Sequence, residues 1–363
     1  MVFGRASRTP VRVQPFFGYR SASALFLTAR ALAQPEPLFE KRGFWRSLSV
    51  MFGQYASREV AGLNVQLEFA LGTGETIRET ATSDEEGFVH FKIAFQQAHE
   101  LPVQTGWDAA ALTWRPAPKS PERSKTAYIL APGKNAATGV ISDIDDTILE
   151  TGITGSARAI LRNWKRVLAQ MPGERIVVPG APEFYSDLGG GTGRKPSDRG
   201  PYNAPVPQPI PRPVFYVSSS PWNLFSYLVT FKHQRDLPLG PIMLRDWGLN
   251  RETLGSQGHG SHKQRAVERL LATYPDMRFV LVGDDTQKDL TVFGETALAL
   301  PDRIAGVFIR QVANRKLNDA EKAIHVGLEA SPVPFWTGSD YAAARNFLAA
   351  ANLRGDVAPN KVN

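Results

Sequence analysis

The sequence predicts an α/β protein with two domains: an N-terminal β-sandwich, then a parallel sheet with helices on both faces. From about residue 10 to 130, short segments alternate between apolar and polar residues and are separated by turns. From residue 138, apolar segments alternate with segments of helical period, which is typical of strands joined by crossover helices. We therefore expect a β-rich domain at 1–130, an α/β domain at 131–330 and a helical C-terminal tail at 331–363.

The expected N-terminal strands include ALFLTARAL, LNVQLEFALG, TIRETAT and FVHFKIAF, with Gly87 in the turn between the last two. The segment 24–34 also has features of a signal peptide, because it follows an Arg-rich start and ends in an A-x-A pattern. Arg30 interrupts its apolar stretch, and the alternation of its residues favours a strand. A Pro- and Ser-rich segment at 116–124 is typical of a linker or a peripheral loop before the second domain.

The second half predicts five strands and four helices. The strands are expected at 138–144, 213–219, 240–246, 278–284 and 304–310, and the helices at 156–170, 222–235, 262–273 and 287–298. Gly- and Pro-rich residues at 188–213 predict an irregular loop. Part of it, GGGTGRKPS, superficially resembles a phosphate-binding loop, but Arg194 stands at the Lys position and Pro196 follows.

Composition limits the classes of function. The chain has 363 residues, 42% of them hydrophobic, and no cysteine, which excludes disulfides, thiolate zinc sites and cysteine nucleophiles. No apolar run approaches the roughly 18 residues that a membrane-spanning helix needs. We expect a cytoplasmic protein that contacts membranes peripherally at most.

Positive charge is concentrated at the N-terminus, where residues 1–60 hold nine basic and three acidic side chains. Within this region, the segment 40–55 mixes Lys41, Arg42 and Arg46 with aromatic residues such as Trp45, as surfaces that contact anionic lipid often do. Aromatic residues in such a segment more often pack into a core, and we favour that interpretation over membrane contact.

The stretch GVISDIDDTILE (139–150) places Asp143, Asp145 and Asp146 directly after an apolar strand. Burying carboxylates costs several kcal/mol each without compensation, so a cation is expected there. The expected strand at 213–219 brings Ser218 to the same edge of the sheet, because ligands bind beyond the carboxyl ends of parallel strands. The strand at 278–284 contributes further carboxylates to that edge. Together they predict a Mg²⁺ site for phosphoryl chemistry.

Four motifs follow in order: hhhhDxDxT, hhhhS, a Lys and hhhhGDxxxxD (h, apolar), the last ending at Asp289. This order resembles the haloacid dehalogenase-like phosphohydrolase superfamily. The blocks DIDDTI, PGAPEFYSDL, VFYVSSSPWNLFSYL, LPLGPIMLRDWG and HK…VLVGDDTQKD also resemble the catalytic domain of the actin-patch-associated phosphatidate phosphatase family. The resemblance covers 138–310 strongly and the β-rich half weakly. It implies a haloacid dehalogenase-like Rossmannoid sheet in the C-terminal domain.

The resemblance also implies a role for each motif residue. Asp143 would be the nucleophile that forms an aspartyl-phosphate, and Asp145 would be the general acid and base. Thr147 would brace the turn. The remaining implied roles are phosphoryl binding by Ser218 and Lys263, and Mg²⁺ binding by Asp143, the Asp145 backbone carbonyl and Asp284, supported by Asp289 or Asp285.

Neighbouring polar residues have plainer interpretations. Asp146 is expected to cap a turn, and Ser219 and Ser220 are expected to satisfy nearby backbone groups. His259 and His262 have the spacing of a metal pair, but they lack further ligands nearby and are expected to be polar loop residues.

The function predicted from these features is a Mg²⁺-dependent phosphomonoesterase whose substrate, by resemblance, is phosphatidate or a related lipid phosphate. The segment between the first two motifs is expected to hold one helix and a Gly/Pro-rich loop, too little for a large cap domain, which suits a bulky substrate. Two alternatives stay open: a phosphatase acting on nucleic-acid ends or a phosphoprotein, and a non-catalytic lipid-binding adaptor. No nucleic-acid partner is expected under the main interpretation.

Overall fold

The computed structural model describes residues 11–33, 58–72, 74–149, 177–189, 207, 210–245, 259–286, 288–312 and 316–355. The chain divides into two compact units, one holding Asp108–Ile129 with the residues up to Glu100, the other Leu101–Trp107 with the residues from Leu130 onward. Several predictions lie outside the described residues. They are the helix at 156–170, the basic segment at 40–55, the role of His259, and most of the irregular loop at 188–213 with the rejected phosphate-binding loop in it.

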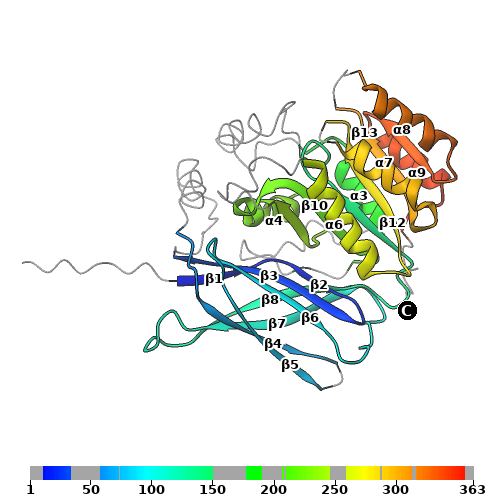
Figure 1. Ribbon diagram of the computed structural model, residues 1–363. Helices are drawn as coiled ribbons and strands as arrows, with labels where there is room; N and C mark the ends of the chain where they lie inside the picture. The colour runs from blue at the N-terminus through cyan, green and yellow to red at the C-terminus, as the bar shows by residue number, and fades with distance from the viewer. Residues whose placement is uncertain are drawn as a thin grey trace, which may run out of the picture. The chain divides into compact units, whose positions relative to one another are not determined.

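The first unit is built on one eight-stranded sheet. Its strands are β1 (Val11–Pro15), β2 (Gly18–Arg20), β3 (Ala24–Ala33), β4 (Asn64–Ala70), β5 (Thr76–Thr82), β6 (Phe88–Ala94), β7 (Gly106–Trp114) and β8 (Arg123–Ala131). They follow the order β1-β3-β2-β8-β7-β4-β5, and β6 pairs with β3 (Figure 1). The strand expected at 24–34 is therefore confirmed as β3. Of the two interpretations of the segment 116–124, the structure supports a loop and not an interdomain linker, because most of the segment connects β7 to β8 within this sheet.

The core of this unit follows from the two-residue period of its strands. In β4, Val65, Leu67 and Phe69 are buried while the residues between them are exposed, because successive side chains point to opposite faces. They share one apolar cluster with Leu25 and Leu27 of β3, although three strands separate β3 from β4 in the sheet. Strands from across the sheet therefore share one apolar core, and the sandwich arrangement stays a prediction.

The second unit contains a six-stranded parallel sheet. Its strands are β9 (Thr138–Ser142), β10 (Val214–Pro221), β11 (Ile242–Arg245), β12 (Arg278–Asp284), β13 (Ile304–Arg310) and β14 (Phe335–Gly338). They are arranged β11-β10-β9-β12-β13-β14, and every neighbouring pair is parallel. Counted from β9, this is the doubly wound order 3-2-1-4-5-6, whose direction reverses between β9 and β12.

Helices cover both faces of this sheet (Figure 1). They are α3 (Ala181–Gly189), α4 (Phe225–Gln234), α6 (His259–Thr273), α7 (Asp289–Ala299), α8 (Asp319–Ala330) and α9 (Tyr341–Ala350), with short 3-10 turns η2 (Trp222–Leu224) and η3 (Pro301–Arg303). Phe308 of β13 packs on Phe184 of α3 with ring centroids 5.4 Å apart. Phe279 of β12 packs on Tyr274, beside the end of α6. Val282 pairs with Phe308 and lies three residues from Phe279, so the two contacts are on opposite faces.

The C-terminal segment differs from the expected helical tail. β14 pairs with β13 as the sixth strand, and α9 buries Tyr341, Ala344 and Leu348 against the same unit. A four-residue strand has too few residues for its period to be recognised, and its partner is distant in sequence, so only the tertiary structure reveals it.

Candidate active site

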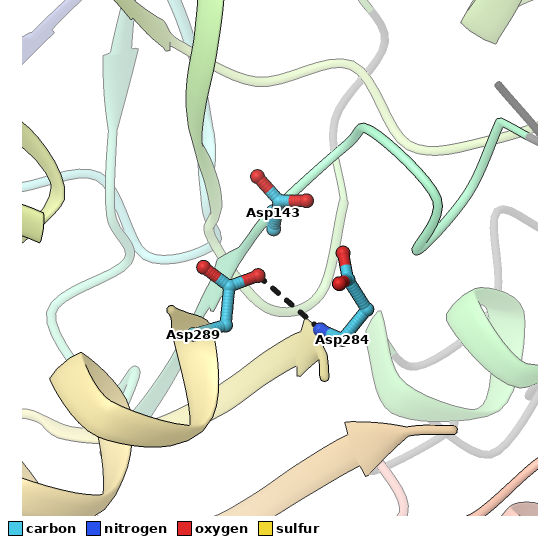
Figure 2. A group of neighbouring side chains, drawn as sticks. All are labelled: Asp143, Asp284 and Asp289. Atoms are coloured by element: carbon cyan, nitrogen blue, oxygen red, sulfur yellow. Dashed lines mark hydrogen bonds between the residues drawn. The ribbon is translucent and has the colours of Figure 1, made fainter. Parts of the chain in front are cut away.

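The candidate site lies where the strand order reverses. Asp143 follows β9, Asp284 ends β12, and Asp289 begins α7. Oxygen atoms of these three carboxylates lie within 4.8 Å of one another, and all three side chains are buried. Figure 2 shows them around a common space, with the Asp284 backbone N–H donating to Asp289 Oδ2 at 3.2 Å. Several hard oxygen ligands at one point are what Mg²⁺ prefers, so this donor set fits the expected ion.

Lys263 of α6 supplies positive charge to this cluster. Its Nζ lies 2.8 Å from Asp143 Oδ1 and also contacts Asp289 Oδ1, and these side chains are fully buried. Burial alone would lower the pKa of Lys263, but the neighbouring carboxylates outweigh it and raise that pKa above its ordinary value. The lysine is therefore an ammonium throughout the physiological pH range.

One ammonium does not balance the carboxylates. Burial raises the pKa of Asp143 well above its usual value, although Lys263 opposes the shift. Burial and the neighbouring Asp289 raise the pKa of Asp284 to about 7. The cluster thus holds excess negative charge that protons or a bound cation must offset.

The turn after β9 orients these groups. Asp146 adopts a left-handed conformation, with φ of 57°, and its N–H donates to Leu149 O at 2.8 Å. Aspartate tolerates this conformation better than most residues do, which agrees with the expected turn role. Thr147 Oγ1 lies 3.4 Å from Asp143 Oδ2 and 3.3 Å from Asp284 Oδ2, so its hydroxyl faces both carboxylates.

Asp145 is separate from the three-carboxylate cluster and is held by two hydroxyls. Ser218 Oγ donates to its Oδ2 at 2.7 Å, and Ser220 Oγ donates to the same oxygen at 2.9 Å. Burial raises the pKa of Asp145, while these hydrogen bonds oppose the rise. The contact of Ser220 was missed from the sequence. The spacing could have found it, because residues two apart in a strand share a face.

Asp285, the other candidate metal ligand, is not brought to the cluster. Its N–H donates to Arg310 O and its Oδ1 accepts from Val312 N–H, both at 3.0 Å, so the residue continues the backbone contact with β13. Of the two alternatives, the structure places Asp289 in the cluster. His262 lies with Nε2 at 3.2 Å from Met243 O, in a backbone contact.

The fold and site define an α/β protein of the doubly wound class with a buried carboxylate cluster at its switch point. Residues 138–311 match the family model described as "Phosphatidate phosphatase APP1, catalytic domain". Over 176 residues the chain is 31% identical to phosphatidate phosphatase APP1 of Saccharomyces cerevisiae. The aligned segment covers 48% of this chain and 26% of that protein. Residues 138–311 are therefore similar to the APP1 catalytic domain over its matched segment.

Other similarities are weaker. An uncharacterized protein of Schizosaccharomyces pombe is 26% identical over 175 residues, which is 48% of this chain and 25% of that protein. The chain thus spans about a quarter of the length of these curated relatives. A β-glucuronidase structure from Parabacteroides merdae aligns at 11% identity over 90% of this chain and 39% of that chain, with a TM-score of 0.25 that supports no argument. Among the described residues, no helix is long and apolar enough to cross a membrane.

Proposed function

We propose that this protein is a Mg²⁺-dependent phosphomonoesterase with a haloacid dehalogenase-like catalytic domain, and that its substrate is phosphatidate or a related lipid phosphate. The observation that carries the proposal is the cluster of Asp143, Asp284 and Asp289 around Lys263 at the sheet's switch point. The family match of the same segment supports the reaction class.

In this proposal, Asp143 and Asp284 hold the metal ion, supported by Asp289 and the backbone carbonyl of Asp145. When bound, Mg²⁺ neutralises negative charge on the transferring phosphoryl group. The excess of buried carboxylates over the ammonium of Lys263 supports this assignment, because such a site is stable only with a compensating cation or proton.

The chemical steps use two carboxylates. An oxygen of Asp143 attacks phosphorus, the bond from phosphorus to the leaving oxygen breaks, and Asp145 gives that oxygen a proton. Water then attacks the aspartyl-phosphate, Asp145 takes the water's proton, and inorganic phosphate leaves with Asp143 regenerated. The raised pKa of Asp145 supports its part, because a proton donor must hold its proton until the leaving group departs.

We assign binding of the phosphoryl group to Lys263 and Ser218. Lys263 is a permanent cation beside the proposed nucleophile, where it would attract a phosphoryl oxygen. Ser218 Oγ donates to Asp145 in this structure, so substrate binding would redirect that hydroxyl or share it.

The lipid substrate rests on different support from the reaction type. The name of the matched family model and of the Saccharomyces cerevisiae relative supports phosphatidate. The sequence between the first two motifs includes a Gly/Pro-rich stretch that leaves too little for a large cap domain, which supports a site that admits a bulky headgroup and its chains.

The test is phosphate release from phosphatidate in mixed micelles and from soluble phosphomonoesters, including phosphorylated oligonucleotide ends and phosphopeptides. Each assay is run with Mg²⁺, with EDTA, and with Ca²⁺ in place of Mg²⁺. We expect hydrolysis that EDTA removes and Mg²⁺ restores, with poor recovery in Ca²⁺ because its looser coordination misplaces an in-line attack. Activity that survives chelation would contradict the metal assignment, and a preference for nucleic-acid ends or phosphopeptides would contradict the lipid substrate.

A further inference from the structure

We propose that Tyr341 of α9 is a positioning residue for the candidate nucleophile turn, so that the working catalytic domain extends past the matched segment 138–311 into the C-terminal helices. The inference rests on the proposed function for its catalytic consequence. Its structural part is independent of that function.

The direct contact is a hydrogen bond across 194 residues of sequence. Tyr341 Oη donates to the Thr147 carbonyl oxygen at 2.8 Å, and both residues are buried. Burial raises the pKa of Tyr341, so its hydroxyl keeps the proton that this bond requires. Because the side chain of Thr147 faces Asp143 and Asp284, the position of this backbone unit sets the position of a hydroxyl in the carboxylate cluster.

The turn itself needs external restraint. Asp146 has φ of 57°, a conformation that costs free energy in a residue other than glycine. Arg310 Nη1 donates to the Asp146 carbonyl at 2.6 Å, and Tyr341 holds the next carbonyl along the chain. Two side chains from β13 and α9 therefore hold consecutive peptide units of the turn.

Tyr341 is in turn fixed by aromatic packing beneath the turn. Its ring stacks on Phe184 of α3 with centroids 4.7 Å apart and meets the edge of Tyr185 at 6.5 Å. The hydroxyls of Tyr185 and Ser142 are 2.5 Å apart, and Ser142 Oγ donates to the Asp143 carbonyl at 2.6 Å. The tyrosine pair thus connects to the turn on both sides of the proposed nucleophile.

The helix that carries Tyr341 is anchored independently of its hydroxyl. Asp340 caps α9 by accepting from the Ala342 N–H at 2.8 Å. Arg345 on the same helix pairs with Asp187 of α3 at 2.9 Å. Removing the hydroxyl alone should therefore leave α9 in place and change chiefly the restraint on the turn.

The test compares Tyr341→Phe with a matched control, Tyr216→Phe. Tyr216 is also fully buried in this unit, and its hydroxyl donates to the Pro238 carbonyl at 2.7 Å, away from the carboxylates. Each variant keeps its ring and loses a buried hydroxyl that donates to a backbone carbonyl, and the Tyr341 hydroxyl also interacts with that of Tyr185. Both should lose a similar, small amount of thermal stability, about 2–4 °C in Tm.

Steady-state kinetics on a soluble phosphomonoester with saturating Mg²⁺ give the first readout. For Tyr341→Phe we expect kcat to fall about tenfold with KM within about twofold of wild type, because a displaced turn harms alignment more than binding. For Tyr216→Phe, both constants should match wild type. A kcat for Tyr341→Phe equal to that of the control would overturn the positioning role while leaving the proposed function intact.

Hydrogen exchange gives a second readout that needs no activity. Amides of Asp146, Ile148 and Leu149 form the hydrogen bonds of the turn, and they should exchange faster in Tyr341→Phe than in Tyr216→Phe. If wild-type protein releases no phosphate from any substrate, the proposed function fails and exchange alone decides the inference. Equal exchange in the two variants would then overturn it.

Discussion

Lys263 Nζ lies 2.8 Å from Asp143 Oδ1, and both side chains are fully buried. This ammonium partly neutralises the carboxylate of Asp143, the proposed nucleophile. It does not replace a divalent cation, because the carboxylates of Asp284 and Asp289 lie in the same cluster and one positive charge cannot balance all three. This charge balance underlies the predictions for Asp143 and Asp289 below.

The change Asp143→Asn should abolish phosphate release, by at least about 10³-fold, because the amide cannot serve as the nucleophile. The protein should remain folded, with Tm unchanged or higher, because a buried like charge is removed from the cluster. Phosphate release and a thermal melt measure the two effects. The control is Asp319→Asn in α8, which removes an exposed carboxylate paired with Lys322 and should retain activity. Substantial residual activity in Asp143→Asn would sink the covalent mechanism.

Asp145→Asn should be nearly inactive on phosphate esters with poor leaving groups and less impaired on an activated aryl phosphate. The reason is that an aryl oxide leaves without a proton, whereas an alkoxide needs the one that Asp145 would donate. The ratio of kcat/KM on the two substrates is the measurement. If both substrates lost activity equally, Asp145 would have a structural role through Ser218 and Ser220.

The variants Asp289→Asn and Asp285→Asn form a matched pair, because each removes one negative charge and the two positions are four residues apart. Asp289 belongs to the carboxylate cluster, so its substitution should weaken Mg²⁺ binding and raise the Mg²⁺ concentration needed for half-maximal activity by about 10-fold or more. Asp285 holds the Val312 N–H instead, so its substitution should leave the Mg²⁺ requirement unchanged. A Mg²⁺ titration of both variants checks this, and the reverse ranking would return Asp285 to the metal site.

We predict that the buried side chain of Lys232 in α4 lowers the free energy of unfolding. It is fully buried, its Nζ has no hydrogen-bond partner within the described part of the chain, and that atom lies 3.5 Å from the centroid of the Tyr216 ring. Burial lowers the pKa of Lys232 well below its ordinary value, so the folded protein holds this amine neutral over a wider range of pH than an exposed lysine. We expect Lys232→Met to raise the free energy of unfolding by about 1–3 kcal/mol near pH 7.

The sign of its pH dependence follows from proton binding. Unfolded Lys232 keeps its proton up to a pKa of about 10.4, so between the lowered folded pKa and that value the unfolded chain binds more protons. Wild-type stability therefore increases with pH through this window, and the advantage of Lys232→Met should shrink from pH 7 to pH 10. Denaturant melts at several pH values measure it, with the exposed Lys322→Met as control. A destabilised Lys232→Met would contradict the prediction.

Local signals in the sequence were enough for much of the architecture. Alternation in ALFLTARAL predicted β3 despite its likeness to a signal peptide, because the period of a strand shows directly in its residues. Strand-end motifs likewise predicted that Asp143 and Asp284 would meet, since the ends of parallel strands share one edge. The assigned chemical roles of these residues remain predictions.

Tertiary structure decided what depends on contacts between distant segments. Asp285 and Asp289 could not be ranked from their spacing, because the choice depends on Asp285 continuing its backbone contact with β13 while α7 begins at Asp289. Nothing in the sequence indicated the role of Tyr341. Its hydrogen bond joins α9 to a turn that lies 194 residues earlier in the chain, and α9 follows the short edge strand β14. Periodicity reports which face of an element is buried. Which residue it meets there depends on the path of the whole chain.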